Sequence, residues 1–180
     1  MIAQRQEAQF ASYPDPSPSN RSWAILADLQ NAHIRLIAAI KDLAKITGQT
    51  RGDKVEYSAI RFRVSEASLA RRITFRTACD FLLPTASPGD EQTISRLRSA
   101  DSELAKHASG HVQKWTTATV DLDWEGYCLA MGEMRRGLLK QIELERSMLY
   151  PLLHKHGSIR RGMIRLIPIE EFLAEEEAAG

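Results

Sequence analysis

Residues 124–152 decide the fold, and they read WEGYCLAMGEMRRGLLKQIELERSMLYPL. Their apolar side chains recur at the spacing of one face of an amphipathic helix. This stripe comprises Trp124, Tyr127, Cys128, Met131, Met134, Leu138, Ile142, Met148, Leu149 and Leu152. Continued in heptad steps, the stripe includes Glu145, and Gln141 lies one turn earlier at its edge. The pattern predicts a long helix whose buried face carries a carboxylate.

A second long helix is predicted from Ser22, a favourable N-cap, to Gly48, a favourable C-terminal stop. His33 occupies one position of its apolar face, whose other members are Leu26, Leu29, Leu36, Ile40 and Leu43. An imidazole and a carboxylate that both point inward need partners, because burying an unpaired charge costs several kcal/mol. The polar residues of these two helices are therefore the candidates for a site.

Two further helices complete the expected fold. One follows the polar turn at residues 49–53 and ends at Pro84, and the next begins near Gly89 and ends around Thr119. Asp123 is then expected to cap the fourth helix, which ends near Gly157. Long helices joined by short turns predict an all-α fold, an antiparallel up-down-up-down four-helix bundle. The expected organisation is a flexible N-terminal arm at 1–21, the bundle at 22–157 and a C-terminal extension at 158–180.

Composition indicates an ordinary soluble domain. The chain has 180 residues, of which 26% are charged, and a formal net charge of +1, so nothing points to nucleic acid as a partner. No apolar run has the length of a signal peptide or a membrane span, which predicts a cytoplasmic protein that is not bound to a membrane. Cys79 and Cys128 lie far apart in apolar runs and are expected to be reduced core thiols.

The antiparallel arrangement places residues by height, at about 1.5 Å of rise per residue. At the level of His33, the third helix presents Asp101 and the fourth presents Glu145. The second helix reaches this level between about Ala70 and Thr77. We expect His33, Asp101 and Glu145 to converge, either as the ligands of a metal or as a buried polar cluster into which Arg76 or Arg98 reaches.

Two other features of the sequence are candidates for a functional site. His107 and His111 are spaced to clamp one metal from a single helix face, with Glu66 as the nearest carboxylate candidate. The second helix also has a basic face, for which we expect a solvated surface because no aromatic platform accompanies it. Its members are Arg61, Arg63, Arg71, Arg72 and Arg76.

Residues 138–153 resemble the last helix of hemerythrin-like (HHE cation-binding) domains, and they read LLKQIELERSMLYPLL. That helix typically contains a histidine, three further residues, a glutamate, and an ending of Leu-Phe/Tyr-Pro. Glu145 matches the glutamate and Leu149-Tyr150-Pro151 the ending, while Gln141 stands at the histidine position. Residues 27–43, ADLQNAHIRLIAAIKDL, resemble the first helix of the family, with His33 at its metal-binding histidine.

The chain departs from the family in its second helix, which contains no histidine. Ala70 and Thr74 stand where the resemblance implies a histidine–glutamate pair, so the ligand set is reduced to His33, Glu145 and Asp101. A di-iron centre needs more nitrogen and oxygen donors than these. Two hypotheses follow: a non-catalytic bundle without its metal centre that acts as a regulatory or interaction module, or a protein that binds iron or another metal and senses oxygen species.

The tail combines an apolar run, Met163 to Ile169, with Phe172 and Leu173 beyond it. This is more apolar surface than a chain leaves in water. We expect it to pack on the bundle or to be buried against a homodimer partner or another protein.

Overall fold

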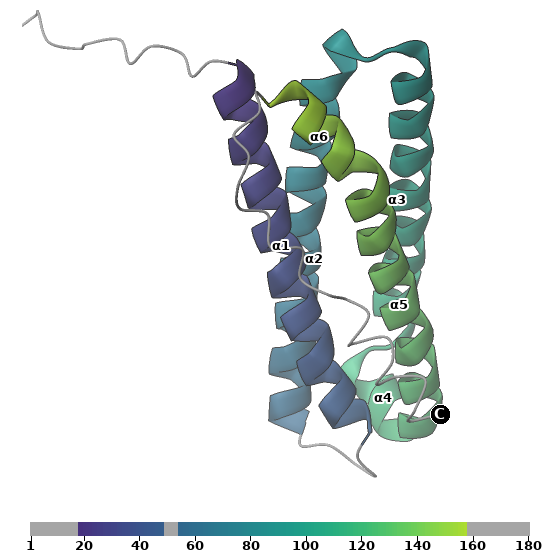
Figure 1. Cartoon of the computed structure of the whole chain (residues 1–180). Coiled ribbons are helices and arrows are strands. Elements are labelled where there is room, and N and C mark those ends of the chain that lie inside the picture. Colours follow the sequence, from purple (N-terminus) through teal and green to yellow (C-terminus); the bar gives the residue numbers. More distant parts are fainter. Residues whose placement is uncertain (1–17, 49–53, 158–180) are drawn as a thin grey trace, which may run out of the picture.

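The computed structural model describes residues 18–48 and 54–157 (Figure 1). Its long helices are α1 (Pro18–Thr47), α2 (Lys54–Leu82), α3 (Pro88–Lys114) and α5 (Trp124–Leu144). A 3-10 turn, η1 (Leu83–Thr85), follows α2, and the short helix α4 (Thr117–Leu122) precedes α5. The last helix continues from α5 through a π-helical turn, η2 (Glu145–Leu149), into α6 (Tyr150–His156). In this part of the chain there are helices and turns but no strand, which confirms the predicted all-α class.

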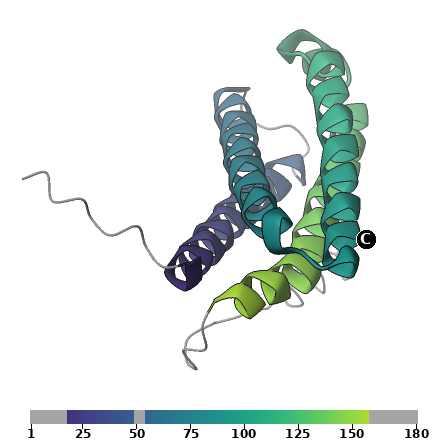
Figure 2. The same ribbon diagram turned by 90° about the horizontal axis from the view of Figure 1, so that it is seen from above.

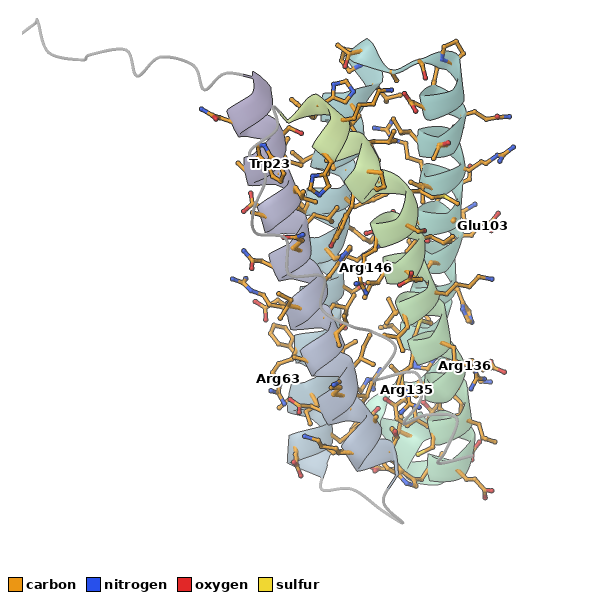
Figure 3. All side chains as sticks on the ribbon, viewed as in Figure 1. Trp23, Arg63, Glu103, Arg135, Arg136 and Arg146 are labelled. Carbon is orange, nitrogen blue, oxygen red and sulfur yellow. The ribbon has the colours of Figure 1, made fainter. Side chains whose placement is uncertain are left out.

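The long helices lie side by side in Figure 1, where α2 and α3 are joined at the upper end and α4 lies between α3 and α5 at the lower end. Seen from above, α1 lies beside α2, and α3 lies beside α5 (Figure 2). The most extensive contact joins α1 and α2, and α6 packs against α1. Figure 3 shows Trp23 in the first turns of α1 beside α6, where its ring meets the ring of His154 edge-on at 4.8 Å.

Local capping explains where the helices begin. The Ser87 hydroxyl accepts the backbone N–H of Asp90 at the start of α3, and Pro88 supplies a preset φ in the first turn. Asp123 Oδ1 accepts the backbone N–H of Gly126 at 2.8 Å, so the predicted cap of the fourth helix is confirmed. The predicted third helix is wrong at its C-terminal end, because it ends at Lys114 and Thr116 caps the separate helix α4.

The predicted start of the first helix is also wrong. Helix α1 begins at Pro18, so Ser22 is a fully buried residue inside the helix and not its N-cap. Its hydroxyl donates a 2.6 Å hydrogen bond to the carbonyl oxygen of Leu153, which joins α1 to α6. The expected arm at 1–21 therefore loses residues 18–21 to the helix, and residues 1–17 and 158–180 lie outside the described part.

A π-helical turn rotates the end of the last helix. Pro151 has no N–H to donate to the carbonyl of Ser147, and the backbone N–H of Tyr150 bonds to the carbonyl of Glu145, five residues earlier. The additional residue in this turn moves the buried face along by one position. Tyr150 and Leu153 are consequently buried, whereas Met148, predicted on the inward stripe, is 40% exposed.

The core consists of two apolar clusters. One contains Leu36, Ile40, Leu43, Tyr57, Ile60, Tyr127, Met134, Leu138 and Ile142, and the other contains Leu26, Leu29, Phe75, Leu82, Ile94, Leu97, Leu149 and Leu153. Each fully buried aliphatic or aromatic side chain stabilises the fold by about 1.5–3 kcal/mol. On every one of the long helices, a buried polar residue lies in sequence between the members of the two clusters. The core is thus divided by a polar layer.

Across residues 18–48 and 54–157, none of the helices has a stretch both long and apolar enough to span a bilayer.

Candidate functional site

The polar layer consists of one residue from each of the long helices. His33 comes from α1, Arg71 from α2, Asp101 from α3 and Glu145 from the junction of α5 with η2. Their exposed fractions are 3%, 1%, 3% and 0%, respectively. Ionisable side chains this deeply buried must be paired, so the contacts among them define the site.

His33 connects Glu145 to Tyr150. Its Nε2 lies 2.8 Å from Glu145 Oε2, so of the two carboxylates expected to converge with His33, Glu145 is the one that it contacts. Its Nδ1 lies 2.7 Å from the hydroxyl oxygen of Tyr150. A carboxylate only accepts, so Nε2 is the donor in the hydrogen bond to Glu145, and Nδ1 and the Tyr150 hydroxyl form the second hydrogen bond of the ring.

Arg71 joins the two carboxylates of the layer. One guanidinium nitrogen, Nη1, donates to Glu145 Oε1, and the other, Nη2, donates to Asp101 Oδ1. Arg72 Nε donates to Asp101 Oδ2 at 3.3 Å, and Gln141 Nε2 donates to Glu145 Oε1 at 2.9 Å. The guanidinium groups of Arg71 and Arg72 therefore balance the charges of Glu145 and Asp101.

These contacts correct two expectations about the arginines. The sequence predicts Arg71 on a solvated face, but it is 1% exposed and it is the arginine that reaches into the core. Arg76 is exposed, and Arg98 pairs with Asp80, so neither of them enters the layer. Arg71 lies within the height window of about 70–77 that the helix count gave for α2. That window was the signal that could have identified it.

The structure brings Glu145 to His33 but separates both of them from Asp101 by the guanidinium of Arg71. Among the described residues, no three histidine, cysteine, aspartate or glutamate side chains are grouped so that they could hold a metal ion. A cation at Glu145 and Asp101 would take the position of the Arg71 donors. The residues that the resemblance implies as ligands are thus already used in hydrogen bonds to protein groups.

The Tyr150 hydroxyl contacts the His33 imidazole, which in turn contacts the Glu145 carboxylate. Catalytic triads with a hydroxyl nucleophile have the same sequence of groups. Two observations argue against that chemistry here. All three side chains are at most 5% exposed, so a substrate cannot reach the hydroxyl. Burial, the largest cause, also raises the pKa of Tyr150 well above its usual range, so the phenolate is disfavoured. The arrangement can hold a proton in place and orient helices.

His107 and His111 do not form a metal site with Glu66. His107 and Glu66 are exposed, whereas His111 is half-buried, with its ring 5.9 Å from that of Tyr127. Burial, followed by the charges of Arg61, His107 and Lys114, lowers the pKa of His111 to about 4. The two rings of the pair therefore lie in different surroundings.

Both cysteines are free, as expected. Cys79 is buried and Cys128 is half-buried at the margin of the core. Burial raises the pKa of the Cys79 thiol to about 11, so it is a core group and not a reactive thiolate.

Comparisons of the chain with protein-family models, with curated proteins and with solved structures found no match. The function of the site must therefore be inferred from the contacts and burial of its residues.

Proposed function

We propose that this chain is a non-catalytic helical bundle in which an arginine takes the place of a metal centre, and that it acts as a regulatory or interaction module. The observation that carries the proposal is the Arg71 guanidinium, which lies between Glu145 and Asp101 and donates to both. The guanidinium balances the negative charge of the two buried carboxylates, as a bound metal ion would.

Electrostatics favours this interpretation over a metal site. A guanidinium is always protonated and presents its donors in a rigid planar fork that matches carboxylate oxygens. A metal that bound Glu145 would have to displace Arg71 and leave a buried guanidinium unpaired, which costs several kcal/mol. Gln141 adds to the argument, because its side-chain amide donates to Glu145 Oε1 where a histidine nitrogen would serve a metal.

The proposal extends to the architecture and the setting. We infer an antiparallel up-down-up-down bundle of the hemerythrin-like kind, because α4 and the connection of α2 to α3 lie at opposite ends in Figure 1 and the four polar residues meet at one level. We also infer a cytoplasmic protein that associates with a second copy or another protein. The free thiols support the cytoplasmic setting, because disulfides are rare in cytosolic proteins.

The competing proposal is a protein that binds iron or another metal with His33, Glu145 and Asp101 and senses oxygen species. Metal analysis of full-length protein from iron-supplemented cells separates the two proposals. We expect a metal content well below one ion per chain for the natural sequence. For Arg71→Met, which frees the two carboxylates, we expect a higher content than for Arg76→Met, its exposed control on the same helix.

A natural chain that holds one or more metal ions, and loses them in the Glu145→Gln variant, would overturn the proposal. A metal content that is high but unaffected by Glu145→Gln would place a metal elsewhere and leave the interpretation of the polar layer intact.

A further inference from the structure

An open groove of about 420 Å³ runs between α2 and α3, on the side of the core next to the polar layer. Its walls come from these two helices, which are well separated in Figure 2, and its floor comes from Met131, Met134 and Leu138 of α5. Pockets that bind small molecules have volumes of about 300–1,000 Å³ and mainly apolar linings. The groove has the size and the lining of such a site.

The apolar surface of the groove continues to its margins. Leu104 and Ala108 line the groove from α3, and Leu69 and Val112 border it with exposed fractions of 57% and 55%. Apolar surface in contact with water costs about 25 cal/mol per Å² relative to buried surface. Exposed apolar side chains that gather around a depression therefore indicate a ligand that covers them.

One end of the groove carries a positive charge that no carboxylate balances. Arg61 donates from Nη1 to the hydroxyl of Tyr57 and from Nη2 to the carbonyl of Trp115, each at 2.7 Å. Its guanidinium also lies over the ring of Tyr127, with 5.7 Å to the centroid. All of these partners are neutral, and within residues 18–48 and 54–157 no carboxylate lies within ion-pair distance of Arg61.

His111 lines the same end of the groove. Its Nε2 is buried and forms no hydrogen bond with the described residues. The lowered pKa of about 4 means that the ring is neutral near pH 7, so Nε2 can serve a ligand as one donor or one acceptor. The positive charges that contribute to this shift, led by Arg61, make the same place favourable for an anion.

We propose that this groove binds a free long-chain monocarboxylate, with its carboxylate against Arg61 and His111 and its hydrocarbon chain along the apolar floor. One unbalanced guanidinium matches one carboxylate, and the apolar floor of Met131, Met134 and Leu138 matches a hydrocarbon chain. This ligand site goes beyond the proposed function. Arg71 and Asp101 of the polar layer, together with Arg72, also line the groove, but the variants that test the ligand site, at Arg61 and Val112, change no residue of that layer.

Calorimetric titration of the full chain with dodecanoate tests the proposal. We expect one binding site, and binding of dodecanol at least about tenfold weaker, because the alcohol lacks the charge that a charge-assisted hydrogen bond requires. Arg61→Gln should weaken dodecanoate binding by at least about tenfold, while Arg61→Lys keeps the charge and part of the affinity. Arg63→Gln, on the same helix but outside the groove, is the matched control and should bind like the natural chain.

Two further measurements do not depend on Arg61 variants folding well. Val112→Asp places a negative charge at an exposed margin of the groove and should weaken dodecanoate binding, whereas Val112→Asn should weaken it less. The pKa of His111, followed by NMR, should rise when dodecanoate binds and stay constant with dodecanol.

Equal affinity for acid and alcohol, or no effect of Arg61→Gln, would overturn the proposal. So would binding only to vesicles of anionic phospholipid, which would indicate a membrane surface as the occupant. A concentration-dependent dimer that Val112→Asp dissociates and dodecanoate leaves unchanged would overturn it in favour of a second copy.

Discussion

Arg71 and Arg61 lie on the same helix, about three turns apart, and they meet opposite surroundings. Arg71 is fully buried and donates to two carboxylates from two other helices. Arg61 is half-buried and has only a hydroxyl, a carbonyl and aromatic rings as partners. The first arginine completes a balanced layer, and the second leaves a charge beside an open groove.

The same residue type therefore stabilises the core at one position and is available to bind an anion at the other. When a guanidinium is buried between carboxylates, removal of either partner strongly lowers the free energy of unfolding. The charge that remains is then unpaired in a low-dielectric core. A guanidinium with neutral partners is held in position, but its charge remains available to an anion from outside. Substitution of each arginine, followed by measurement of the unfolding free energy, tests whether the two differ in this way.

The largest effect is expected for Arg71→Met. Without the guanidinium, Asp101 and Glu145 are buried as partly unpaired carboxylates, and the free energy of unfolding should fall by about 3–5 kcal/mol. Urea denaturation followed by circular dichroism measures this change. Arg76→Met, exposed on the same helix, should stay within about 0.5 kcal/mol of the natural chain. A loss below about 1 kcal/mol for Arg71→Met would show that the ion pairs do not stabilise the layer.

The next effect concerns the bond between His33 and Tyr150. Tyr150→Phe leaves His33 Nδ1 without its partner and should lower the free energy of unfolding by about 1–3 kcal/mol. In a His33→Leu background the same change should cost at least about 0.5 kcal/mol less, because the two groups are coupled. A double-mutant cycle of urea unfolding measures this coupling. Strictly additive effects would mean that the two side chains do not share a hydrogen bond in solution.

Arg61→Gln should cost only about 1 kcal/mol of unfolding free energy, far less than Arg71→Met. The reason is that its partners are neutral, so removal of the guanidinium leaves no buried charge unpaired. The same urea experiment, performed in parallel on both variants, gives the comparison directly. If both substitutions cost the same, the contrast between the arginines is wrong.

The smallest effect is a pH dependence at the groove. The pKa of His111 is lowered from 6.5 to about 4, so between these values the unfolded chain binds more protons than the folded chain. Stability should therefore fall as the pH decreases from about 6.5 towards 4. After allowance for solvent screening, His111 should lower the free energy of unfolding at pH 5 by about 1 kcal/mol relative to its value at neutral pH.

The measurement for this prediction is the difference in unfolding free energy between the natural chain and His111→Gln at pH 5 and pH 7. The difference between the two proteins should change by about 1 kcal/mol over that interval. Lys106→Gln, which changes an exposed side chain on the same helix, is the control and should show no comparable change. An unchanged difference for His111→Gln would show that the ring titrates normally in the folded state.

The helices and the inward position of the polar residues could be predicted from the sequence, because periodicity and caps are local properties. The stripe around Glu145 and the stripe around His33 are both present in the core, and the two side chains meet at 2.8 Å. The start of α1 could not be predicted, because the partner of Ser22, the carbonyl of Leu153, is far away in sequence and local signals favour Ser22 as a cap.

What the sequence by itself determined is a set of amphipathic helices and the depth of the polar residues on them, since both follow from spacing along one chain. Only the tertiary structure decided that Arg71 turns inward, because a long charged side chain takes its direction from carboxylates on other helices. It also decided that Tyr150 faces His33, because the π-helical turn before Pro151 rotates the end of the last helix. The groove between α2 and α3 has the same origin: it depends on how closely two helices approach, which no periodicity along either helix specifies.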